Sequence, residues 1–564
     1  MWRADEKNAK RRRVTITAEE LSSYGGEISH QEAVAVTLET SGNDPRSDRV
    51  NALNLAWGGT LMTVDCLSLP SEAQRLLREA LESPPVKVFC NAKTDLQFLI
   101  PYGINPTKIF DVTLAHQLLS ENEYPSAGLE EIARRWLKEE TAAEADVLLR
   151  LRRAMIGELK EKGLVWIAKI EFDCAAALAQ MEYHGIQLDL AAWRELTAKA
   201  EEEKGEALEE LRRFGGPRPI QTTLWGDTDA SGENFDSNLQ ILSLLREHGI
   251  EVKSTSKAAL AAHRSHPLVA ALSRYRAVSK QLSTYLLPIP KMLHAKTGRL
   301  HPQYVQIAAW TGRMSCYSPN IQQIPRGKEF RGCFIAPAGR LLLIADYPQI
   351  ELRVAAQITR ARRMLEAYRN GTDLHGLTAS LILGKPLASV SREERQYAKA
   401  VNFGLIYAMG AEGLRLSARQ SYGVEMTHEE AERFRRLFFE AYPSIGEWHA
   451  SLSRRRSPEG RTLTGRRYSF PQWYGLPAHS NAPVQGTAAD ILKLALGRLA
   501  AELAGSEAFI VAAIHDEVIV ECPQECAANC GGLLKRAMEE AARAILPDVP
   551  TTVDVRAARR WSEK

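Results

Sequence analysis

The sequence lacks any uninterrupted apolar run of about 18 residues, the length that a membrane-spanning helix requires. Its most apolar stretches, Leu341–Ala345 and Phe509–Ile514, run directly into Asp or His. The first residues, MWRADEKNAKRRR, contain no apolar segment typical of a secretory signal. We therefore expect no membrane partner and a cytoplasmic location, in a bacterial or phage-infected cell.

Cysteine is also scarce, with 8 residues in a chain of 564, which excludes a disulfide scaffold and favours a reducing compartment. Cys522, Cys526 and Cys530 are spaced four apart and would share one helix face. Zinc sites more often use a closer CxxC pair. We expect small, half-buried helix side chains there, with a metal site as the less favoured alternative.

The chain has no large excess of either charge, because 72 Lys and Arg residues nearly balance 69 Asp and Glu residues and the net charge is +3. A polyanionic partner would therefore have to meet a local concentration of positive charge. Residues 1–26 form a basic arm that could contact nucleic acid, although a solvated tail is the simpler interpretation. The length predicts about three or four domains.

Residues 27–150 alternate strand-like and helix-like stretches, which predicts a compact α/β domain. From about residue 165 the pattern becomes helical, interrupted by a loop at Gly215–Glu233. The expected strands are 34–40, 50–57 and 85–90, and the expected helices are 71–81, 94–99, 112–119, 129–137, 167–184, 191–213, 237–248, 267–285, 393–407 and 427–442.

Two apolar strands carry acids, far apart in the chain. Arg340–Asp346 ends in one, and Phe509–Glu521 is predicted to be a hairpin with Asp516 at its turn. Either aspartate alone could be a turn or cap residue. Together they would repel each other unless a divalent cation lay between them, and Mg²⁺ prefers carboxylates combined with substrate phosphates. Two such ions, about 3.5–4 Å apart, can support an in-line phosphoryl displacement.

Other polar groups suit a nucleotide and a nucleic acid. Arg395, Lys399, Phe403 and Tyr407 recur every four residues, so two cations suited to a triphosphate precede two rings suited to a base. The alternative is a surface Arg and Lys above a core aromatic pair. Amides and Arg that could contact base edges and sugars, or merely cap loops, occur in a polar loop and at the expected start of a helix: Arg313, Asn320, Gln322, Gln323, Asn481 and Gln485.

In this order, the chain contains TGRMS-x3-PNIQQIP from Thr311, DYPQIELR from Asp346, RQYAKAVNFGLIYAMG from Arg395, NAPVQGTAAD from Asn481 and IHDEVIVE from Ile514. The sequence thereby resembles family A DNA polymerases, in particular the large, Klenow-type fragment of the bacterial enzymes. Weaker similarity at Met181–Asp189 and Ser283–Tyr285 extends the resemblance over nearly the whole chain.

The resemblance implies an α/β multidomain protein, a right-hand polymerase preceded by a ribonuclease H-like 3′–5′ exonuclease-type domain. The expected boundaries are 1–26 for the arm, 27–160 for the exonuclease-like domain and 161–564 for the polymerase domain. Within the latter we expect the thumb at about 190–295, the palm at about 296–360 and 490–564, and the fingers at about 361–489.

The resemblance also implies roles for single residues. Asp346, Asp516 and the backbone carbonyl of Tyr347 would hold two Mg²⁺ ions, which Mn²⁺ could replace, with Glu517 in support, and Lys399 would protonate the leaving pyrophosphate. The nucleotide would be bound by Arg395, Lys399, Phe403, Tyr407, His375, Gln349 and Glu351, of which Glu351 is the steric gate against ribose. Primer–template DNA would be contacted by Arg313, Asn320, Gln323, Asn481, Gln485, His515 and Thr284.

The chain departs from the family pattern at Pro348, where Ser is usual, and at Ala408, where Gly is usual. The loop between Arg467 and Asn481 is short and lacks an Arg close before Asn481. These changes bear on fidelity and on DNA grip more than on chemistry.

The exonuclease-like domain departs further. Thr37 stands in the Asp position of the first motif, beside Glu39, whereas the second motif keeps Asp95. The third offers only Glu144 or Asp146 and has no Tyr. A hydroxyl cannot replace a carboxylate as a strong metal ligand, so we expect that proofreading is lost and that the domain is a platform. We also expect no 5′ nuclease domain before residue 27.

Two other functions are compatible with part of the pattern. A single-subunit RNA polymerase shares the palm carboxylates, but Glu351 would exclude its substrate. A catalytically inactive DNA-binding scaffold would not need both aspartates and both triphosphate cations. We therefore expect a monomeric DNA-templated DNA polymerase that uses primer–template DNA and deoxynucleoside triphosphates, in replication or in repair.

Overall fold

The computed structural model describes residues 12–16, 21–66, 71–123, 125, 127–138, 145–215, 234–472 and 474–564. Most of the basic arm, nearly all of the loop at 215–233, and Glu144 therefore lie outside the described residues. Among the residues that are described, no helix is both long enough and apolar enough to cross a membrane.

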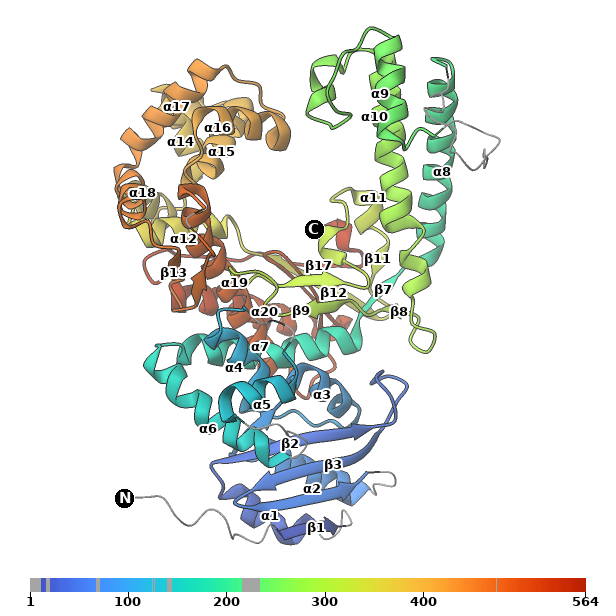
Figure 1. Ribbon diagram of the computed structural model, residues 1–564, viewed down its shortest axis with the longest axis vertical. Helices are drawn as coiled ribbons and strands as arrows, with labels where there is room; N and C mark the ends of the chain where they lie inside the picture. Colours follow the sequence, from blue (N-terminus) through green and yellow to red (C-terminus); the bar gives the residue numbers. More distant parts are fainter. Residues whose placement is uncertain are drawn as a thin grey trace.

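The N-terminal part is a six-stranded sheet in the order β1-β4-β3-β2-β5-β6, flanked by helices (Figure 1). β2 pairs antiparallel with β3 and parallel with β5, so this mixed sheet confirms the predicted α/β domain. Its elements are β1 (Arg12–Ile16), α1 (Leu21–Ser29), β2 (Ala33–Thr40), β3 (Val50–Trp57), β4 (Thr60–Asp65), α2 (Ser71–Glu82), β5 (Val86–Phe89), α3 (Ala92–Leu99), β6 (Ile109–Asp111), α4 (Val112–Leu119), α5 (Leu129–Leu137) and α6 (Ala145–Glu161).

A four-stranded antiparallel sheet, β15-β16-β12-β17, occupies the centre of the molecule. The predicted strand and hairpin thus belong to one sheet, although a helical block separates them in the chain. Four helices pack closely around the strands or around one another. These central elements are α7 (Val165–His184), β12 (Arg340–Asp346), α12 (Ile350–Thr359), α19 (Leu476–Leu503), β15 (Phe509–Ile514), β16 (Glu517–Pro523), α20 (Ala527–Ile545) and β17 (Val555–Ala558).

Two helical arms rise on opposite sides of this sheet (Figure 1). One consists of α8 (Leu190–Arg212), α9 (Asn238–Glu247) and α10 (Pro267–Gln281), continued by a π-helical turn at Leu282–Leu286. The other consists of α13 (Arg362–Arg369), α14 (Leu374–Leu383), α15 (Arg392–Ile406), α16 (Ala411–Ser417), α17 (His428–Ala441) and α18 (Pro443–Arg455).

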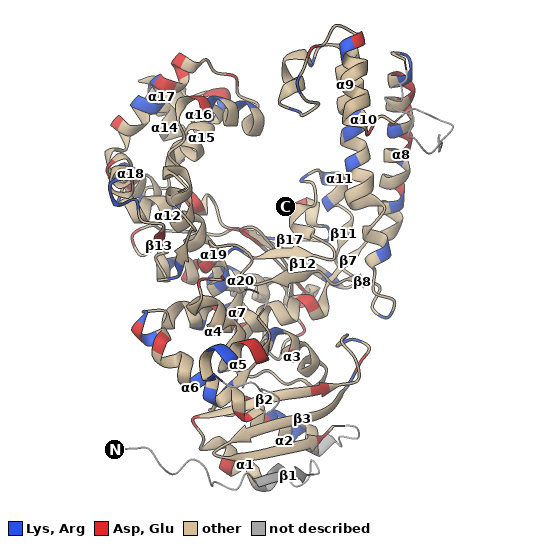
Figure 2. Ribbon diagram, in the orientation of Figure 1, with Lys and Arg blue, Asp and Glu red and all other residues tan. Residues whose placement is uncertain are grey.

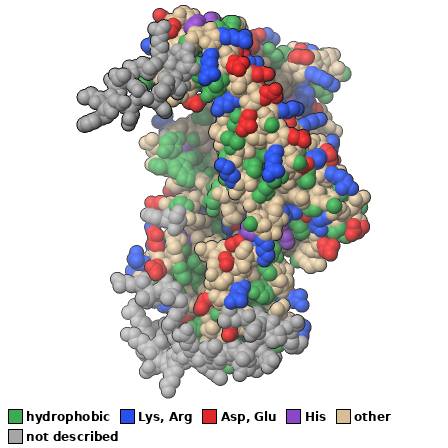
Figure 3. All heavy atoms as spheres, turned by 90° about the vertical axis from the view of Figure 1, so that its right-hand side faces the viewer, with side chains coloured by type: hydrophobic (Ala, Val, Ile, Leu, Met, Phe, Trp, Pro, Cys, Tyr) green, Lys and Arg blue, Asp and Glu red, His purple; other side chains and the backbone are tan. Residues whose placement is uncertain are grey.

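Short elements connect the arms to the centre. They are β7 (Ile186–Leu188), β8 (Arg299–Leu300), β9 (Gln303–Val305), β10 (Ser315–Tyr317), α11 (Lys328–Arg331), β11 (Phe334–Ile335), β13 (Glu459–Arg461) and β14 (Arg467–Ser469). Acidic and basic side chains alternate along α8 and on the face that this arm presents (Figures 2 and 3), in keeping with a net charge near zero.

Two local predictions were wrong. Asn481 and Gln485 do not lie at the start of a helix, because α19 begins at Leu476 and runs through Pro483. Cys522, Cys526 and Cys530 do not share a helix either: the first lies in β16, the second in a 3-10 turn and the third in α20. Pro523 ends β16 between Cys522 and Cys526, so the spacing of four residues does not place these cysteines on one helix face. The predicted domain boundary at 489/490 stays a prediction, although α19 continues across it.

A buried ionic cluster joins three separate parts of the chain. Glu171 on α7 accepts from Lys493 at 2.7 Å, from Gln306 at 2.6 Å and from Arg466. Arg466 also donates to Asp490 at 2.8 Å. Although burial disfavours its ionised form, the charges of Lys493 and Arg466 hold the pKa of Glu171 below its ordinary value. The cluster therefore fixes α7, α19 and the β13–β14 hairpin to one another.

We expect Glu171→Gln to destabilise the protein by about 3–5 kcal/mol, because it leaves two buried cations short of an anionic partner. The difference from the wild type should narrow as the pH falls through the lowered pKa, where the wild-type carboxylate loses its charge. Differential scanning calorimetry from pH 8 down to pH 2 measures both effects.

Glu158→Gln is the control, because Glu158 pairs with Lys162 at 3.2 Å on the surface. Its effect should stay within about 0.5 kcal/mol. Equal melting temperatures for the two variants would contradict a structural role for the cluster.

Candidate active site

Asp346 and Asp516 lie side by side at one end of the central sheet. Asp346 is the last residue of β12 and pairs in register with Glu517, the first residue of β16. His515 and Asp516 form the two-residue turn between the paired residues Ile514 and Glu517. The backbone N–H of Tyr347 donates to the Asp516 carbonyl at 3.2 Å. The strand pairing itself therefore brings the two predicted carboxylates together.

The electrostatics of Asp516 suit the binding of a divalent cation. Burial, together with the charge of Asp346, raises the pKa of Asp516 from 3.8 to about 6. When a neighbouring carboxylate disfavours the ionised form of an acid, a divalent ion between the two stabilises that ionised form. The donor set fits Mg²⁺ or Mn²⁺, since carboxylate oxygens are the ligands that both prefer.

No group of three or more His, Cys, Asp or Glu suited to a metal occurs among the described residues. A catalytic pair of carboxylates leaves coordination positions open for substrate phosphates. Tyr347 is held firmly, because its buried ring places the hydroxyl 2.7 Å from the Met538 carbonyl, to which it donates. That contact fixes the main chain between Asp346 and the following helix.

Glu517 is turned into the protein instead. Its side chain is buried and accepts from the Trp561 indole N–H at 2.5 Å, while Arg331 lies 3.7 Å away. The Lys564 ammonium donates to Glu517 at 2.5 Å and to Asp346 at 2.6 Å. Sequence reasoning missed Lys564, because no motif links it to the aspartates.

The predicted nucleotide-binding side chains lie along α15. A capping box, Ser391 with Glu394, begins this helix. Arg395 is exposed and forms two hydrogen bonds with Asp373, at 2.7 and 2.9 Å. Lys399 lies one turn further on, half-buried, with its ammonium 6.0 Å from the centre of the Tyr422 ring.

Two aromatic rings follow the cations. Phe403 stacks on Tyr422 with centroids 6.5 Å apart and planes inclined by 15°. Tyr407 lies just beyond the last residue of α15, because the helix ends at Ile406. Tyr422 and Asp373 had no sequence signal of their own, since each becomes visible only through its spatial partner.

His375 is buried on α14, where its Nδ1 contacts Asn402 Nδ2 at 2.9 Å. Burial, opposed by Asp373 but reinforced by Arg395 and Lys399, lowers the pKa of His375 to about 4. The ring is therefore neutral near pH 7, and any contact that it makes with a phosphate is that of a neutral hydrogen-bond donor.

Glu351 is held from two sides. The Tyr407 hydroxyl and the Arg313 guanidinium both donate to its carboxylate. Glu351 and Arg313 border a cleft of about 370 Å³ that is also lined by Asp516. Other residues lining it are Gln322, Arg326, Gln349, Phe403 and His515.

The predicted DNA-contacting amides include two with unused hydrogen-bonding capacity. Among the described residues, no partner reaches the buried Oδ1 atoms of Asn320 and Asn481. Gln485 is half-buried on α19, whereas Gln323 and Thr284 are exposed. Buried polar atoms normally find a partner, so these amides suit a ligand that arrives from outside.

The backbone of α19 comes close to the loop that contains Thr311 and Arg313. Gly486 follows Gln485, and a Cβ there would lie 2.9 Å from the Thr311 carbonyl oxygen. The helix can thus pack directly on the loop that carries Arg313. His515 has φ of 60°, and although much of the residue is exposed, its ring is partly withdrawn from solvent. Burial and the charges of three arginines, Arg313, Arg326 and Arg331, lower its pKa, so positive charge is concentrated here.

Two further residues have a left-handed backbone. Gln349, with φ of 54°, precedes α12 and accepts from the Tyr368 hydroxyl at 3.3 Å. Ala408 has φ of 56°, a conformation that a glycine adopts at less cost. The departure from the family pattern at Ala408 therefore falls at a position with a real preference for glycine.

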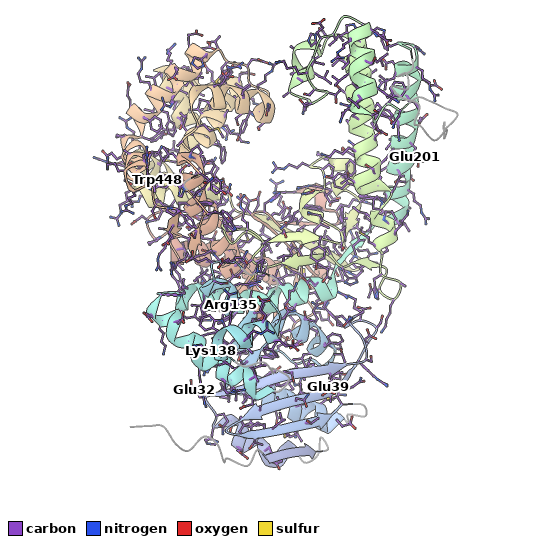
Figure 4. The ribbon with its side chains drawn as sticks, in the orientation of Figure 1. Glu32, Glu39, Arg135, Lys138, Glu201 and Trp448 are labelled. Carbon is purple, nitrogen blue, oxygen red and sulfur yellow. The ribbon has the colours of Figure 1, made fainter. Side chains whose placement is uncertain are left out.

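The exonuclease-like residues are arranged differently. Thr37 and Glu39 lie on β2, where Glu39, labelled in Figure 4, accepts from Asn54 at 3.0 Å. Asn54 in turn accepts from Thr63 at 2.7 Å. The carboxylate of Glu39 is therefore bound to its own sheet.

Sequence reasoning missed Asp111, which is buried near Asp95. Burial and the Asp111 charge raise the pKa of Asp95 well above its ordinary value. Asp111 itself accepts from the backbone N–H groups of Ala92 at 2.6 Å and Thr113 at 2.8 Å, so it caps two helices. Asp146, on α6, lies 3.5 Å from Arg150.

Comparison with known proteins agrees with this geometry. The model of DNA polymerase family A matches residues 227–563, and that of a 3′-5′ exonuclease matches residues 13–153. DNA polymerase I of Aquifex aeolicus is 32% identical over 528 residues, covering 84% of this chain and 87% of that protein.

The thermostable DNA polymerase I of Thermus filiformis is 35% identical over 80% of this chain, which spans 54% of the Thermus protein. Among solved structures, the POL domain of Pol1 from M. smegmatis, in complex with DNA primer-template and dNTP, superposes with a TM-score of 0.82 at 26% identity. That match covers 98% of this chain and 99% of the other.

The raised pKa of Asp516 predicts that Asp516→Asn stabilises the metal-free protein. A rise from 3.8 to about 6 corresponds to about 3 kcal/mol against folding at pH 8, which a neutral amide relieves. Because protonation also neutralises the wild-type carboxylate, the gain should shrink between pH 6 and pH 4. Thermal melting in EDTA across this range measures it.

Asp554→Asn, at an exposed position, is the matched control and should change little. A melting temperature that falls in Asp516→Asn at pH 8 would show that the two acids do not repel each other.

Proposed function

This chain belongs to DNA polymerase family A, and we propose that it extends a primer on a DNA template by phosphoryl transfer at Asp346 and Asp516. The observation that carries the proposal is the pairing of β12 with β16, which brings Asp346 next to Asp516, a residue that lines the cleft. The chain spans about half the length of its Thermus relatives, so the activity of this chain is itself part of the proposal.

Asp346, Asp516 and the Tyr347 carbonyl are the groups that would hold the metal. Two bound Mg²⁺ or Mn²⁺ ions would lower the pKa of the primer 3′ hydroxyl and stabilise the oxygen that leaves with pyrophosphate. The protein's own contribution is to keep both carboxylates rigid, through the sheet pairing and the Tyr347 contact with Met538.

Arg395 and Lys399 would bind the triphosphate from α15. Arg395 now pairs with Asp373, so phosphate binding exchanges one anionic partner for another. Lys399, which is half-buried one turn beyond Arg395, is the group that would donate a proton to the departing pyrophosphate. Phe403 would pack against the new base pair, and His375 would donate to phosphate as a neutral ring.

Glu351 would exclude ribonucleotides. Its carboxylate is fixed by Tyr407 and Arg313, so a ribose 2′-hydroxyl would meet a side chain that cannot easily move. This arrangement favours a DNA polymerase over the RNA polymerase alternative. Arg313 would also contact the primer terminus, together with Asn320, Gln323, Asn481, Gln485, His515 and Thr284.

The exonuclease-like domain would act as a platform without proofreading. Glu39 is engaged by Asn54, and Thr37 supplies no carboxylate. The domain is joined to the centre through Glu182 on α7, which accepts from Lys93 at 2.5 Å and from the Tyr304 N–H at 2.7 Å. Tyr304 in turn accepts from the backbone N–H of Ala513 at 3.3 Å, three residues before Asp516.

The remaining parts of the proposal concern the setting. The chain would act as a monomer on primer–template DNA and deoxynucleoside triphosphates, in the cytoplasm of a bacterial or phage-infected cell. The bacterial relatives and the M. smegmatis Pol1 complex support this setting. Residues at about 190–295 would form the thumb, 361–489 the fingers, and 296–360 with 490–564 the palm.

Asp346→Asn should reduce primer extension by about 10²–10⁴-fold, because the neutral amide loses both charge and metal affinity. Binding of primer–template DNA, followed by fluorescence anisotropy, should be nearly unchanged. Asp548→Asn, at an acid paired with Arg369 at 3.9 Å, is the control and should extend normally. Unaltered synthesis by Asp346→Asn would favour an inactive scaffold with contaminating activity, and preferred use of ribonucleotides would favour an RNA polymerase.

With Mg²⁺ and no nucleotides, the unmodified protein should leave a mismatched primer 3′ end intact. The incubation lasts as long as the same protein needs to extend a matched primer when nucleotides are present. Thr37→Asp restores the missing carboxylate and is the informative comparison, resolved on a denaturing gel. Rapid removal of the mismatched nucleotide by the unmodified protein would refute the loss of proofreading and leave the polymerase assignment untouched.

A further inference from the structure

Lys564 places a cation directly on the carboxylates of the reaction centre. Its ammonium donates to Asp346 Oδ2 at 2.6 Å and to Glu517 Oε2 at 2.5 Å. These two acceptors face each other in the β12–β16 register, so one lysine bridges both strands at the end of the sheet.

The segment that carries Lys564 is tightly anchored. The buried Trp561 ring donates to Glu517 at 2.5 Å and packs against Phe334. Arg560 donates to the Gly332 carbonyl at 2.7 Å and lies 3.1 Å from Asp189. Arg331 lies over the Trp561 ring, at 4.2 Å from its centre. The lysine is therefore presented to the acids by packed neighbours on both sides.

The contact also differs from an ordinary surface ion pair. The Glu517 side chain is 4% exposed and Lys564 is 36% exposed, so the bridge has one buried end and one partly exposed end. Asp346, at 44%, is the open end. The ammonium thus reaches from the interior to the carboxylate that a metal would use.

We infer that Lys564 is a positioning residue that acts as an internal counter-cation, holding one oxygen of Asp346 until a divalent ion displaces it. This inference rests on the proposed role of Asp346 as a metal ligand. Three carboxylates, Asp346, Asp516 and Glu517, gather at this point, and Lys564 offsets part of their mutual repulsion. The same contact makes Lys564 a competitor for the metal.

Binding of Mn²⁺ to the DNA-free protein tests the inference without any turnover. Lys564→Met should tighten Mn²⁺ binding by about three- to tenfold, the range of a partly exposed ion pair, in an electron paramagnetic resonance titration. Lys564→Arg keeps the charge and should bind Mn²⁺ as the wild type does. Lys564→Met should also melt at a lower temperature in EDTA and regain more of its stability when Mn²⁺ is added.

Lys169→Met is the matched control. Lys169 pairs with Asp173 within α7, so this substitution removes the same charge at a site away from the carboxylates. Its Mn²⁺ affinity should stay at the wild-type value. Unchanged or weaker binding in Lys564→Met, or equal tightening in Lys169→Met, would overturn the inference. Asp346→Asn separates the two levels of the argument: if it binds Mn²⁺ like the wild type, the proposed metal site itself fails.

Discussion

The antiparallel pairing of β12 with β16 is the constraint on which the rest of the molecule depends. Asp346 lies opposite Glu517, and Asp516 is the turn residue directly before Glu517. The pairing therefore places Asp516 beside Asp346. The fold thus stores repulsion at one end of an otherwise apolar sheet. Folding must be supported elsewhere, and the buried cluster of Glu171, Arg466, Asp490 and Lys493 together with the sheet's apolar strands supplies that support.

Strain gathers at the same place as the charge. His515 and Gln349 both have a left-handed backbone, although neither is glycine, and each directly precedes an element or residue of the site. Such conformations cost free energy and persist where the surrounding structure determines them. Here the β15–β16 pairing fixes the backbone on both sides of His515, and α12 fixes the backbone that follows Gln349.

The sequence was informative wherever one short segment carries the signal. Apolar runs ending in acids predicted β12 and the β15–β16 hairpin, and the spacing of four in α15 predicted the Arg395–Lys399–Phe403 face. It was uninformative wherever function depends on a partner from a distant segment: Lys564 on Asp346, Tyr422 on Phe403 and Asp373 on Arg395 are pairs without a local pattern. Asn481 was misplaced because α19 begins earlier, at Leu476, and continues through Pro483.

The exonuclease-like domain has contacts that do not depend on a working nuclease site. Thr37 supplies no carboxylate beside Glu39, and Glu39 accepts from Asn54 within the sheet. Its helix α3 meanwhile contributes Lys93 and Gln97 to Glu182, which also holds the Tyr304 backbone. Removing the domain would leave Glu182 buried without two of its donors, next to Tyr304, whose hydroxyl accepts from Ala513 on β15. These contacts would give the domain a structural role even if, as we propose, it does not proofread.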